Sequence, residues 1–257
     1  MKHIAVGCTA LLAVLACTCT THAALVGLDN AAAAVYGDGW DNLDDGTAGG
    51  DAGAFGQWFL GGDGLHSIGD STQVAGGSGG DINASGESFR MQSVNGTYAD
   101  AYRFLDPAGL SVGQTFSIDL AVNFRSGFKG MDLRGASDET IFNFNVGGDD
   151  YAVDQAESGN GSIGNAYSNN TIFELAFTQT SAGGGTWSIT RDGGVTDFDS
   201  GTYSGIARSI KLYIGGQGTA PEDDLYANNL AIVPEPAALA LLGLGCVLLA
   251  GGRRRTP

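Results

Sequence analysis

Apolar side chains in the middle of this chain recur at every second position, and this alternation constrains the fold more than any other feature. In residues 114–124, QTFSIDLAVNF, Phe, Ile, Leu, Val and Phe fall on one face, and mostly polar side chains fall on the other. Successive side chains of a β-strand point to opposite faces, so the pattern predicts a strand with one buried face. Similar patterns predict strands at residues 141–147, 171–179, 186–190, 209–215, 87–94, 97–105 and 224–233.

Glycine-rich segments separate these predicted strands, as in SAGGG at 181–185 and IGGQG at 214–218. Glycine adopts positive φ angles without steric cost, which suits tight reversals of the chain. A longer glycine-rich block at 37–86 is expected to be partly loop, with the aromatic residues of 55–60 returning as a strand. No long segment has a helical period, and no repeat occurs at a constant spacing. We therefore predict an all-β fold, an antiparallel β-sandwich of jelly-roll or concanavalin-like type, over residues 24–232.

The predicted sandwich is strongly acidic. Residues 24–236 contain eight of the 12 basic residues and all 28 acidic residues, which gives a net charge of 8 minus 28, or −20. Such a surface repels nucleic acid phosphates and anionic lipid headgroups at long range, so nucleic acid is excluded as a partner. Neutral glycans and cations are better matched to it.

The first 23 residues have the layout of a secretory signal peptide, which we predict as a short helix removed on export. Lys2 is followed by an apolar run from Ile4 to Ala16 and by small residues that end at Ala23. An alternative remains open at Cys17, because Val-Leu-Ala precedes it in the manner of a lipid-modified cysteine.

The last 25 residues, VPEPAALALLGLGCVLLAGGRRRTP at 233–257, predict a membrane anchor. Residues 237–252 are uncharged and would span about 24 Å as a helix, close to the roughly 30 Å of a bilayer's hydrocarbon core. Three arginines follow, which mark the cytoplasmic side and leave the sandwich outside. The prolines before the run stop the helix from continuing backwards into the sandwich.

This tail resembles the PEP-CTERM sorting signal of bacterial exported proteins. The residues that carry the resemblance are Pro234, Glu235 and Pro236, then the apolar run, then Arg253, Arg254 and Arg255. The resemblance implies an exosortase-like processing enzyme as partner, anchoring through the C-terminal helix before processing, a final location at the cell surface or outside the cell, and an association with exopolysaccharide. The predicted strand at 224–233, joined to this tail, also resembles the last strand of lectin-like, concanavalin-type sandwiches.

Side chains suited to catalysis are scarce. All four cysteines lie in the terminal segments, and His66 is the one histidine after the signal peptide. Multi-histidine zinc sites and Cys-His pairs are therefore excluded, and a Ser-His-Asp triad would have to use His66 in a context without a nucleophile elbow. The six glutamates of residues 24–236 form no closely spaced pair of the kind a glycosidase needs. We predict that the protein is not an enzyme; an envelope glycosidase is the least favoured alternative.

Aspartates concentrate in one glycine-rich stretch, where Asp38, Asp41, Asp44 and Asp45 are candidate ligands for a structural calcium ion. Calcium prefers several oxygen ligands, often from loops. No glutamate closes the loop as in an EF-hand, so a solvated acidic loop without any cofactor is the simpler interpretation.

Glycan binding would use exposed aromatic rings as flat apolar surfaces. The candidates are Trp40, Trp58, Tyr98, Tyr102, Tyr151, Tyr167, Tyr203, Tyr213 and Tyr226. The leading hypothesis is an exported, non-catalytic envelope or matrix protein associated with exopolysaccharide. The alternative is a carbohydrate-binding module, with or without assistance from calcium.

Overall fold

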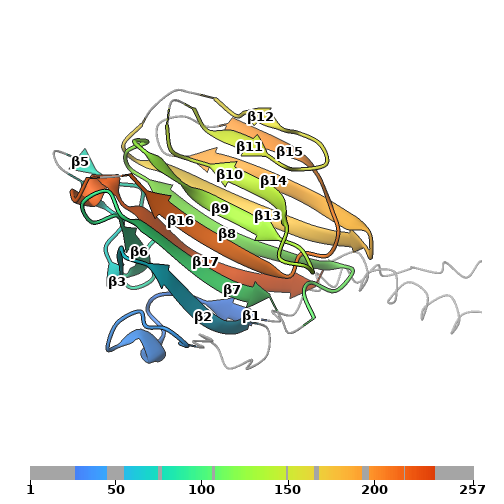
Figure 1. Cartoon of the computed structure of the whole chain (residues 1–257), viewed down its shortest axis with the longest axis horizontal. Coiled ribbons are helices and arrows are strands. Elements are labelled where there is room, and N and C mark those ends of the chain that lie inside the picture. The colour runs from blue at the N-terminus through green and yellow to red at the C-terminus, as the bar shows by residue number, and fades with distance from the viewer. Residues whose placement is uncertain are drawn as a thin grey trace, which may run out of the picture.

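The chain folds as two antiparallel sheets packed face to face, which confirms the predicted all-β sandwich (Figure 1). The computed structural model describes residues 27–44, 55–74, 77–105, 108–148, 150–164, 168–192, 197–216 and 218–234. Within these ranges, no helix is long and apolar enough to cross a membrane. The predicted signal helix at 1–23 and the predicted anchor helix at 237–252 lie outside the described residues.

The first sheet, sheet A, has eight strands. Its order is β15 (Asp197–Ser204), β14 (Gly184–Asp192), β13 (Thr171–Ser181), β8 (Gln114–Val122), β17 (Leu225–Pro234), β6 (Ser88–Gln92) and β3 (Leu65–Gly69), with β1 (Gly27–Asp29) also paired to β17.

The second sheet, sheet B, has seven strands. Its order is β12 (Gly161–Ser162), β11 (Ala152–Asp154), β10 (Thr140–Asn145), β9 (Phe128–Arg134), β16 (Ser209–Gly215), β7 (Tyr98–Leu105) and β2 (Phe55–Gly62). A small hairpin of β4 (Gln73–Val74) and β5 (Gly77–Ser78) and two 3-10 helices, η1 (Ala34–Tyr36) and η2 (Pro221–Asp223), complete the described elements.

The inward faces of the two sheets share one aromatic-rich core. Phe142 of sheet B packs edge-on against Phe177 of sheet A, with ring centroids 4.9 Å apart, and lies 5.2 Å from the ring of Trp187. The alternating residues Phe116, Ile118, Leu120 and Val122 of β8 are fully buried, as their spacing predicts.

The last strand, β17, lies in the middle of sheet A between β8 and β6 and also carries β1. Asn228 of this strand is fully buried: its Oδ1 accepts from the backbone of Ala31, and its Nδ2 donates to the carbonyls of Ile82 and Glu87, all at 2.9 Å. The strand continues to Pro234, which lies opposite Gln114. The first two residues of the tail segment assigned to 233–257 are thus part of the sandwich.

A buried ion pair links the two sheets. Arg103 Nη2 of β7 lies 2.9 Å from Asp29 Oδ2 of β1, and both side chains are fully shielded from solvent. Tyr36 donates to the same carboxylate oxygen at 2.8 Å, and the indole of Trp58 donates to the Tyr36 hydroxyl at 3.0 Å. The guanidinium carbon of Arg103 lies 5.0 Å from the Trp58 ring centroid. Every one of these polar groups therefore needs its neighbours, since unpaired charge in an apolar interior is costly.

Replacing Arg103 with methionine is expected to lower the free energy of unfolding by about 3–5 kcal/mol at neutral pH, because Asp29 is left buried without a counter-charge. Urea unfolding followed by tryptophan fluorescence measures the change. The double variant Asp29→Asn with Arg103→Met removes both charges and should recover part of the loss. Equal stability of the wild type and Arg103→Met would contradict the role of Arg103 as the stabilising counter-charge of Asp29.

Acidification is expected to stabilise the fold between neutral pH and about pH 5. Burial, partly opposed by the facing arginines, raises the pKa of Asp29 and of Asp224 to about 6, from an ordinary value of 3.8. A raised carboxyl pKa means that the folded state binds protons before the unfolded state does, so this contribution is present at low pH and is lost as pH rises through about 6. Between pH 7 and about pH 5, the free energy of unfolding is expected to increase by about 1–3 kcal/mol. Urea midpoints at several pH values test it, and Asp224→Asn should show a shallower dependence.

Candidate functional site

The outer face of sheet B carries the most elaborate set of solvent-facing polar and aromatic side chains in the described part of the chain. Strand alternation places them there: Met131 and Leu133 of β9 are buried in the core, so Asp132 and Arg134 between and beyond them point outward. In the same way, Lys211 and Tyr213 of β16 point outward. The register sets Lys211 opposite Asp132 on one side and opposite Tyr102 on the other.

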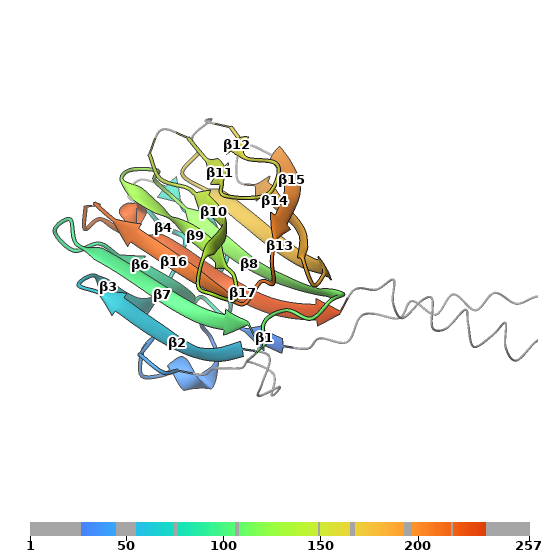
Figure 2. The same ribbon diagram turned by 45° about the vertical axis from the view of Figure 1, so that its right-hand side comes forward.

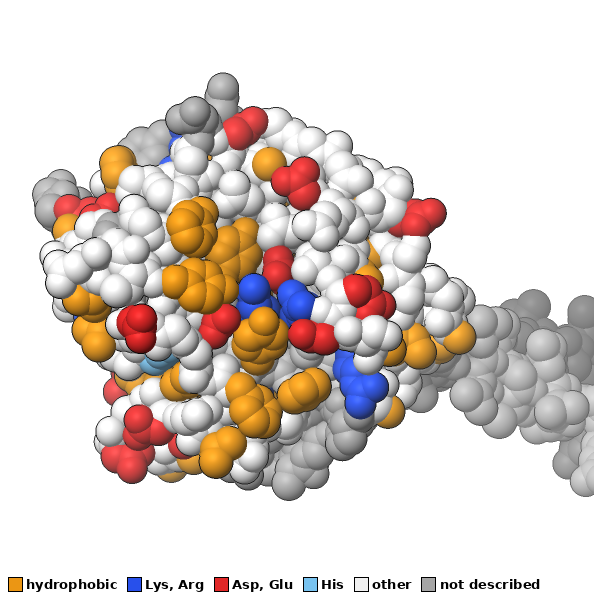
Figure 3. All heavy atoms as spheres, viewed as in Figure 1, with side chains coloured by type: hydrophobic (Ala, Val, Ile, Leu, Met, Phe, Trp, Pro, Cys, Tyr) orange, Lys and Arg blue, Asp and Glu red, His pale blue; other side chains and the backbone are white. Residues whose placement is uncertain are grey.

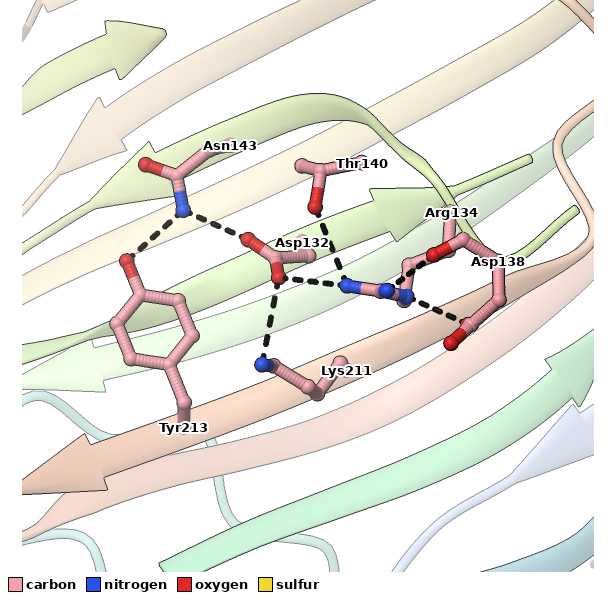
Figure 4. A network of polar contacts seen from close by, with 7 residues as sticks. All are labelled: Asp132, Arg134, Asp138, Thr140, Asn143, Lys211 and Tyr213. Carbon is pink, nitrogen blue, oxygen red and sulfur yellow. Dashed lines mark hydrogen bonds and ion pairs between the residues drawn. The ribbon is translucent and has the colours of Figure 1, made fainter. Parts of the chain in front are cut away.

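Asp132 is the centre of a polar network, here called the Asp132 network, whose members are Asp132, Arg134, Asp138, Thr140, Asn143, Lys211 and Tyr213 (Figure 4). Arg134 Nη1 donates to Asp132 Oδ2 at 3.2 Å, and Lys211 Nζ lies 3.6 Å from the same oxygen. Asn143 Nδ2 donates to Asp132 Oδ1 at 2.7 Å and contacts the Tyr213 hydroxyl at 2.9 Å.

The rim of the network is formed by the β9–β10 hairpin. Arg134 Nε donates to Asp138 Oδ1 at 2.7 Å, its Nη2 donates to the Asp138 carbonyl, and its Nη1 donates to Thr140 Oγ1 at 3.1 Å. Two carboxylates therefore face one arginine and one lysine. The network is close to neutral, unlike the protein as a whole.

Aromatic rings border the network on both sides. Lys211 Nζ lies 5.7 Å from the Tyr102 ring centroid and 5.8 Å from that of Tyr213, and the guanidinium of Arg134 lies 5.7 Å from Tyr102. Figure 3 shows basic and acidic side chains together in the middle of the face, with hydrophobic side chains around them.

A shallow pocket of about 400 Å³ opens beside Tyr102, lined by Phe59, Tyr102, Phe104 and Asp138. The rings of Phe59 and Phe104 meet edge to face at 5.9 Å and are 42% and 38% exposed. On another part of the face, Tyr98 stacks on the exposed ring of Phe128 at 6.3 Å.

The tyrosine hydroxyls of this face stay protonated at neutral pH. Burial raises the pKa of Tyr213 to about 12, although the amide of Asn143 favours the ionised form. Burial also raises the pKa of Tyr102 and of Tyr98. Each hydroxyl can therefore both donate and accept a hydrogen bond, and none is prepared to act as a base near pH 7.

His66 has a structural environment away from the Asp132 network. Its Nε2 lies 2.8 Å from the Asp100 carbonyl, and its ring meets Trp40 edge-on at 5.5 Å. Burial lowers the pKa of His66 below its ordinary value, so the ring is neutral at pH 7. The carboxylates of the network are themselves committed to Arg134 and Lys211. The arrangement offers hydrogen-bond donors, acceptors and flat apolar rings, which suits binding better than proton transfer.

The aromatic candidates from the sequence divide into two groups. Tyr98, Tyr102 and Tyr213 lie on the outer face of sheet B. Trp40, Trp58, Tyr151, Tyr203 and Tyr226 are core residues, each at most 3% exposed, which overturns their candidacy as glycan platforms. Tyr167 lies outside the described residues. Phe59, Phe104 and the members of the Asp132 network other than Tyr213 were not predicted as site residues. The alternating pattern at 97–105 and 209–215 was the signal in the sequence that part of this face is exposed.

The predicted calcium ligands are only partly described. The carboxylate of Asp44 accepts a hydrogen bond from the backbone N–H of Asp41 at 2.7 Å, which closes a turn. No group of three or more potential metal ligands is found among the described residues, which include Asp38, Asp41 and Asp44. Asp45 lies outside the described ranges, so calcium binding there stays a prediction.

The sorting signal is confirmed by comparison with known families: residues 233–255 match the PEP-CTERM protein-sorting motif. The motif implies export, anchoring of the C-terminus in a membrane before processing, and processing by an exosortase. Of its predicted key residues, Pro234 ends β17, and Glu235, Pro236, Arg253, Arg254 and Arg255 lie outside the described ranges. The protein is an antiparallel β-sandwich that carries a PEP-CTERM sorting tail.

Several solved structures are similar to this chain at low sequence identity and low TM-score. An alginate lyase from Corynebacterium sp. has 16% identity over 63% of this chain and 82% of that chain, with a TM-score of 0.40. The carbohydrate recognition domain of Emp46p has 10% identity over 77% and 97%, with a TM-score of 0.37. A family 22 carbohydrate-binding module of Clostridium thermocellum Xyn10B has 12% identity over 75% and 91%, with a TM-score of 0.30. A search of curated proteins finds no match. At this distance no ligand or activity is transferred.

Replacing Asp132 with asparagine is expected to destabilise the protein by about 1–3 kcal/mol, because Arg134 and Lys211 lose their shared counter-charge in a site where the Asp132 side chain is only 10% exposed. The matched control is Asp138→Asn, at a side chain that is 66% exposed, where the cost should stay below about 1 kcal/mol. Asparagine also tolerates the positive φ of Asp138. Urea unfolding compares the two; equal costs would contradict the central role of Asp132.

Proposed function

We propose that this exported protein binds a neutral extracellular polysaccharide on the outer face of sheet B and does not cleave it. The observation that carries the proposal is the combination of the pocket formed by Phe59, Tyr102 and Phe104 with the adjoining Asp132 network. A sugar ring has apolar C–H faces and a hydroxyl-bearing rim. Flat aromatic rings match the first, and a fixed array of charged and amide groups matches the second.

The charge of the site supports a neutral ligand. Asp132 and Asp138 balance Arg134 and Lys211, and Asp100 of β7 lies on the same face. A polyanionic chain would meet no surplus of cations here and would be repelled by the net −20 of residues 24–236. Neutral hydroxyl-rich polymers avoid this cost.

The site is also largely prepared before binding. Asp132 is held from both sides by Arg134, Lys211 and Asn143, so these side chains lose little further freedom when a ligand arrives. Sorting through the PEP-CTERM tail would deliver this face to the envelope or the extracellular matrix, where exopolysaccharide is the available polymer. We propose that the protein associates with this exopolysaccharide and does not act on it as an enzyme.

Replacing Tyr102 or Phe104 with alanine is expected to weaken binding to a neutral polysaccharide about tenfold each, equivalent to about 1.4 kcal/mol, because each removes a ring that would contact the sugar. Affinity electrophoresis in gels containing neutral or anionic polysaccharides measures the effect. Phe198→Ala is the control, since Phe198 is 64% exposed but belongs to β15 of sheet A.

Three outcomes would count against the proposal: no retardation by any neutral polysaccharide, equal losses in Phe198→Ala, or tighter retardation by anionic polymers. Incubation with the retained polysaccharide tests the absence of catalysis. New reducing ends or unsaturated sugar products would show an enzyme. A parallel gel with a calcium chelator separates calcium-assisted binding from binding by sheet B alone.

A further inference from the structure

We propose that, while the tail is anchored, the end of the sandwich at which β17 finishes rests on the bilayer surface. This end is called the tail-side end and is formed by the end of β17 and the turns at 108–113, 181–184 and 205–208. Figure 2 shows β17 pointing toward the end at which β1 begins, and Gly27 lies opposite Ile232. The proposal uses the anchoring that the sorting motif implies and is independent of the glycan site.

The connection between strand and anchor is too short to let the sandwich move away. Pro234 is still paired in β17, opposite Gln114, and the apolar run of the tail begins at Ala237. Three peptide units reach at most about 10 Å. The membrane surface must therefore lie close to Pro234 once the apolar run is inserted.

The described turns of the tail-side end have a charge that fits a lipid surface. Its three turns contain no Asp or Glu among their described residues, and their one charged residue is Arg208. Val112 is 62% exposed, and Ala182 is exposed at the tip of the β13–β14 turn. Such a surface meets anionic headgroups without repulsion, whereas most of this protein would be repelled.

Acidic residues lie instead in the connections at the opposite end: Asp63 follows β2, Asp150 lies between β10 and β11, and Glu222 and Asp223 precede β17. The β9–β10 hairpin lies at the tail-side end as well, because the backbone N–H of Arg208 donates to the Arg134 carbonyl at 2.9 Å. Its carboxylates are engaged within the hairpin: Asp138 is paired with Arg134, and Glu139 accepts a hydrogen bond from the backbone of Ser137. Glu157 accepts a hydrogen bond from Ser204. β17 spans ten residues, or about 33 Å, so the acidic end stands well outside the roughly 8 Å screening length of the membrane field.

This orientation has a direct consequence for access. The strands run away from the bilayer, so the plane of sheet B lies parallel to the membrane normal. Its outer face therefore points sideways, along the membrane surface. The pocket beside Tyr102 and the Asp132 network open on this sideways face rather than on the tail-side end, and Asp138 is their member closest to that end.

The test uses the full chain with Cys8, Cys17, Cys19 and Cys246 replaced by serine, because the described residues contain no cysteine. Single fluorophores are attached at Val112→Cys, Ala182→Cys or Thr219→Cys; the last site is exposed and precedes η2 at the acidic end. The proteins are inserted into vesicles of phosphatidylethanolamine and phosphatidylglycerol that carry headgroup-nitroxide lipid. Fluorophores at 112 and 182 should lose more than half of their intensity, and the fluorophore at 219 should lose almost none.

A flexible glycine-serine insert between Pro234 and Glu235 provides the control, since it should restore most of the intensity at 112 and 182. Failure of the protein to float with vesicles, equal quenching at the three sites, stronger quenching at 219, or quenching unaffected by the insert would each overturn the proposal. Polysaccharide retardation of the same labelled proteins reports separately on the glycan site.

Discussion

The apolar interior shared by the two sheets decides which side of every strand is available to the outside. Phe116, Phe142 and Phe177 must meet between the sheets, and a strand cannot bury one residue without turning its neighbours outward. Tyr102, Asp132 and Lys211 occupy their positions because the residues beside them are committed to the core. A shift of one residue would move the whole polar and aromatic set inward and the core residues outward, so the register is strongly specified.

The same rule explains which parts of the fold were predictable. β8 and β13 alternate cleanly between apolar and polar residues and were predicted from the sequence. β9 was missed because its inward positions include Lys129, whose ammonium is buried and donates to the carbonyls of Phe124 and Asp223 at 2.5 and 2.6 Å. β15 was missed because it is an edge strand with mostly exposed, polar residues. Buried polar groups and edge strands both break the simple pattern.

The two functional elements differ in how far a sequence can show them. The sorting tail is linear, so its proline motif, apolar run and arginines are visible without any structure. The Asp132 network is assembled from β9, β10 and β16, and its members become neighbours only through cross-strand register. Nothing local distinguishes Asp132 from the other aspartates of an acidic chain. A tyrosine on a predicted strand does not show by itself whether its ring is buried or exposed: Tyr203 is a core residue, and Tyr102 lies on the outer face of sheet B.

The position of β17 sets the order of events during export. A chain that crosses a membrane from its N-terminus delivers β8 and β6 long before the strand that must lie between them. Until then, both inner edges of sheet A have unpaired backbone groups, and the pocket for Asn228 is incomplete. Sheet A can therefore be completed only when β17, the strand that leads directly into the sorting tail, has been delivered. Completion of the sandwich and delivery of the sorting tail are therefore neighbouring steps in the order of the chain.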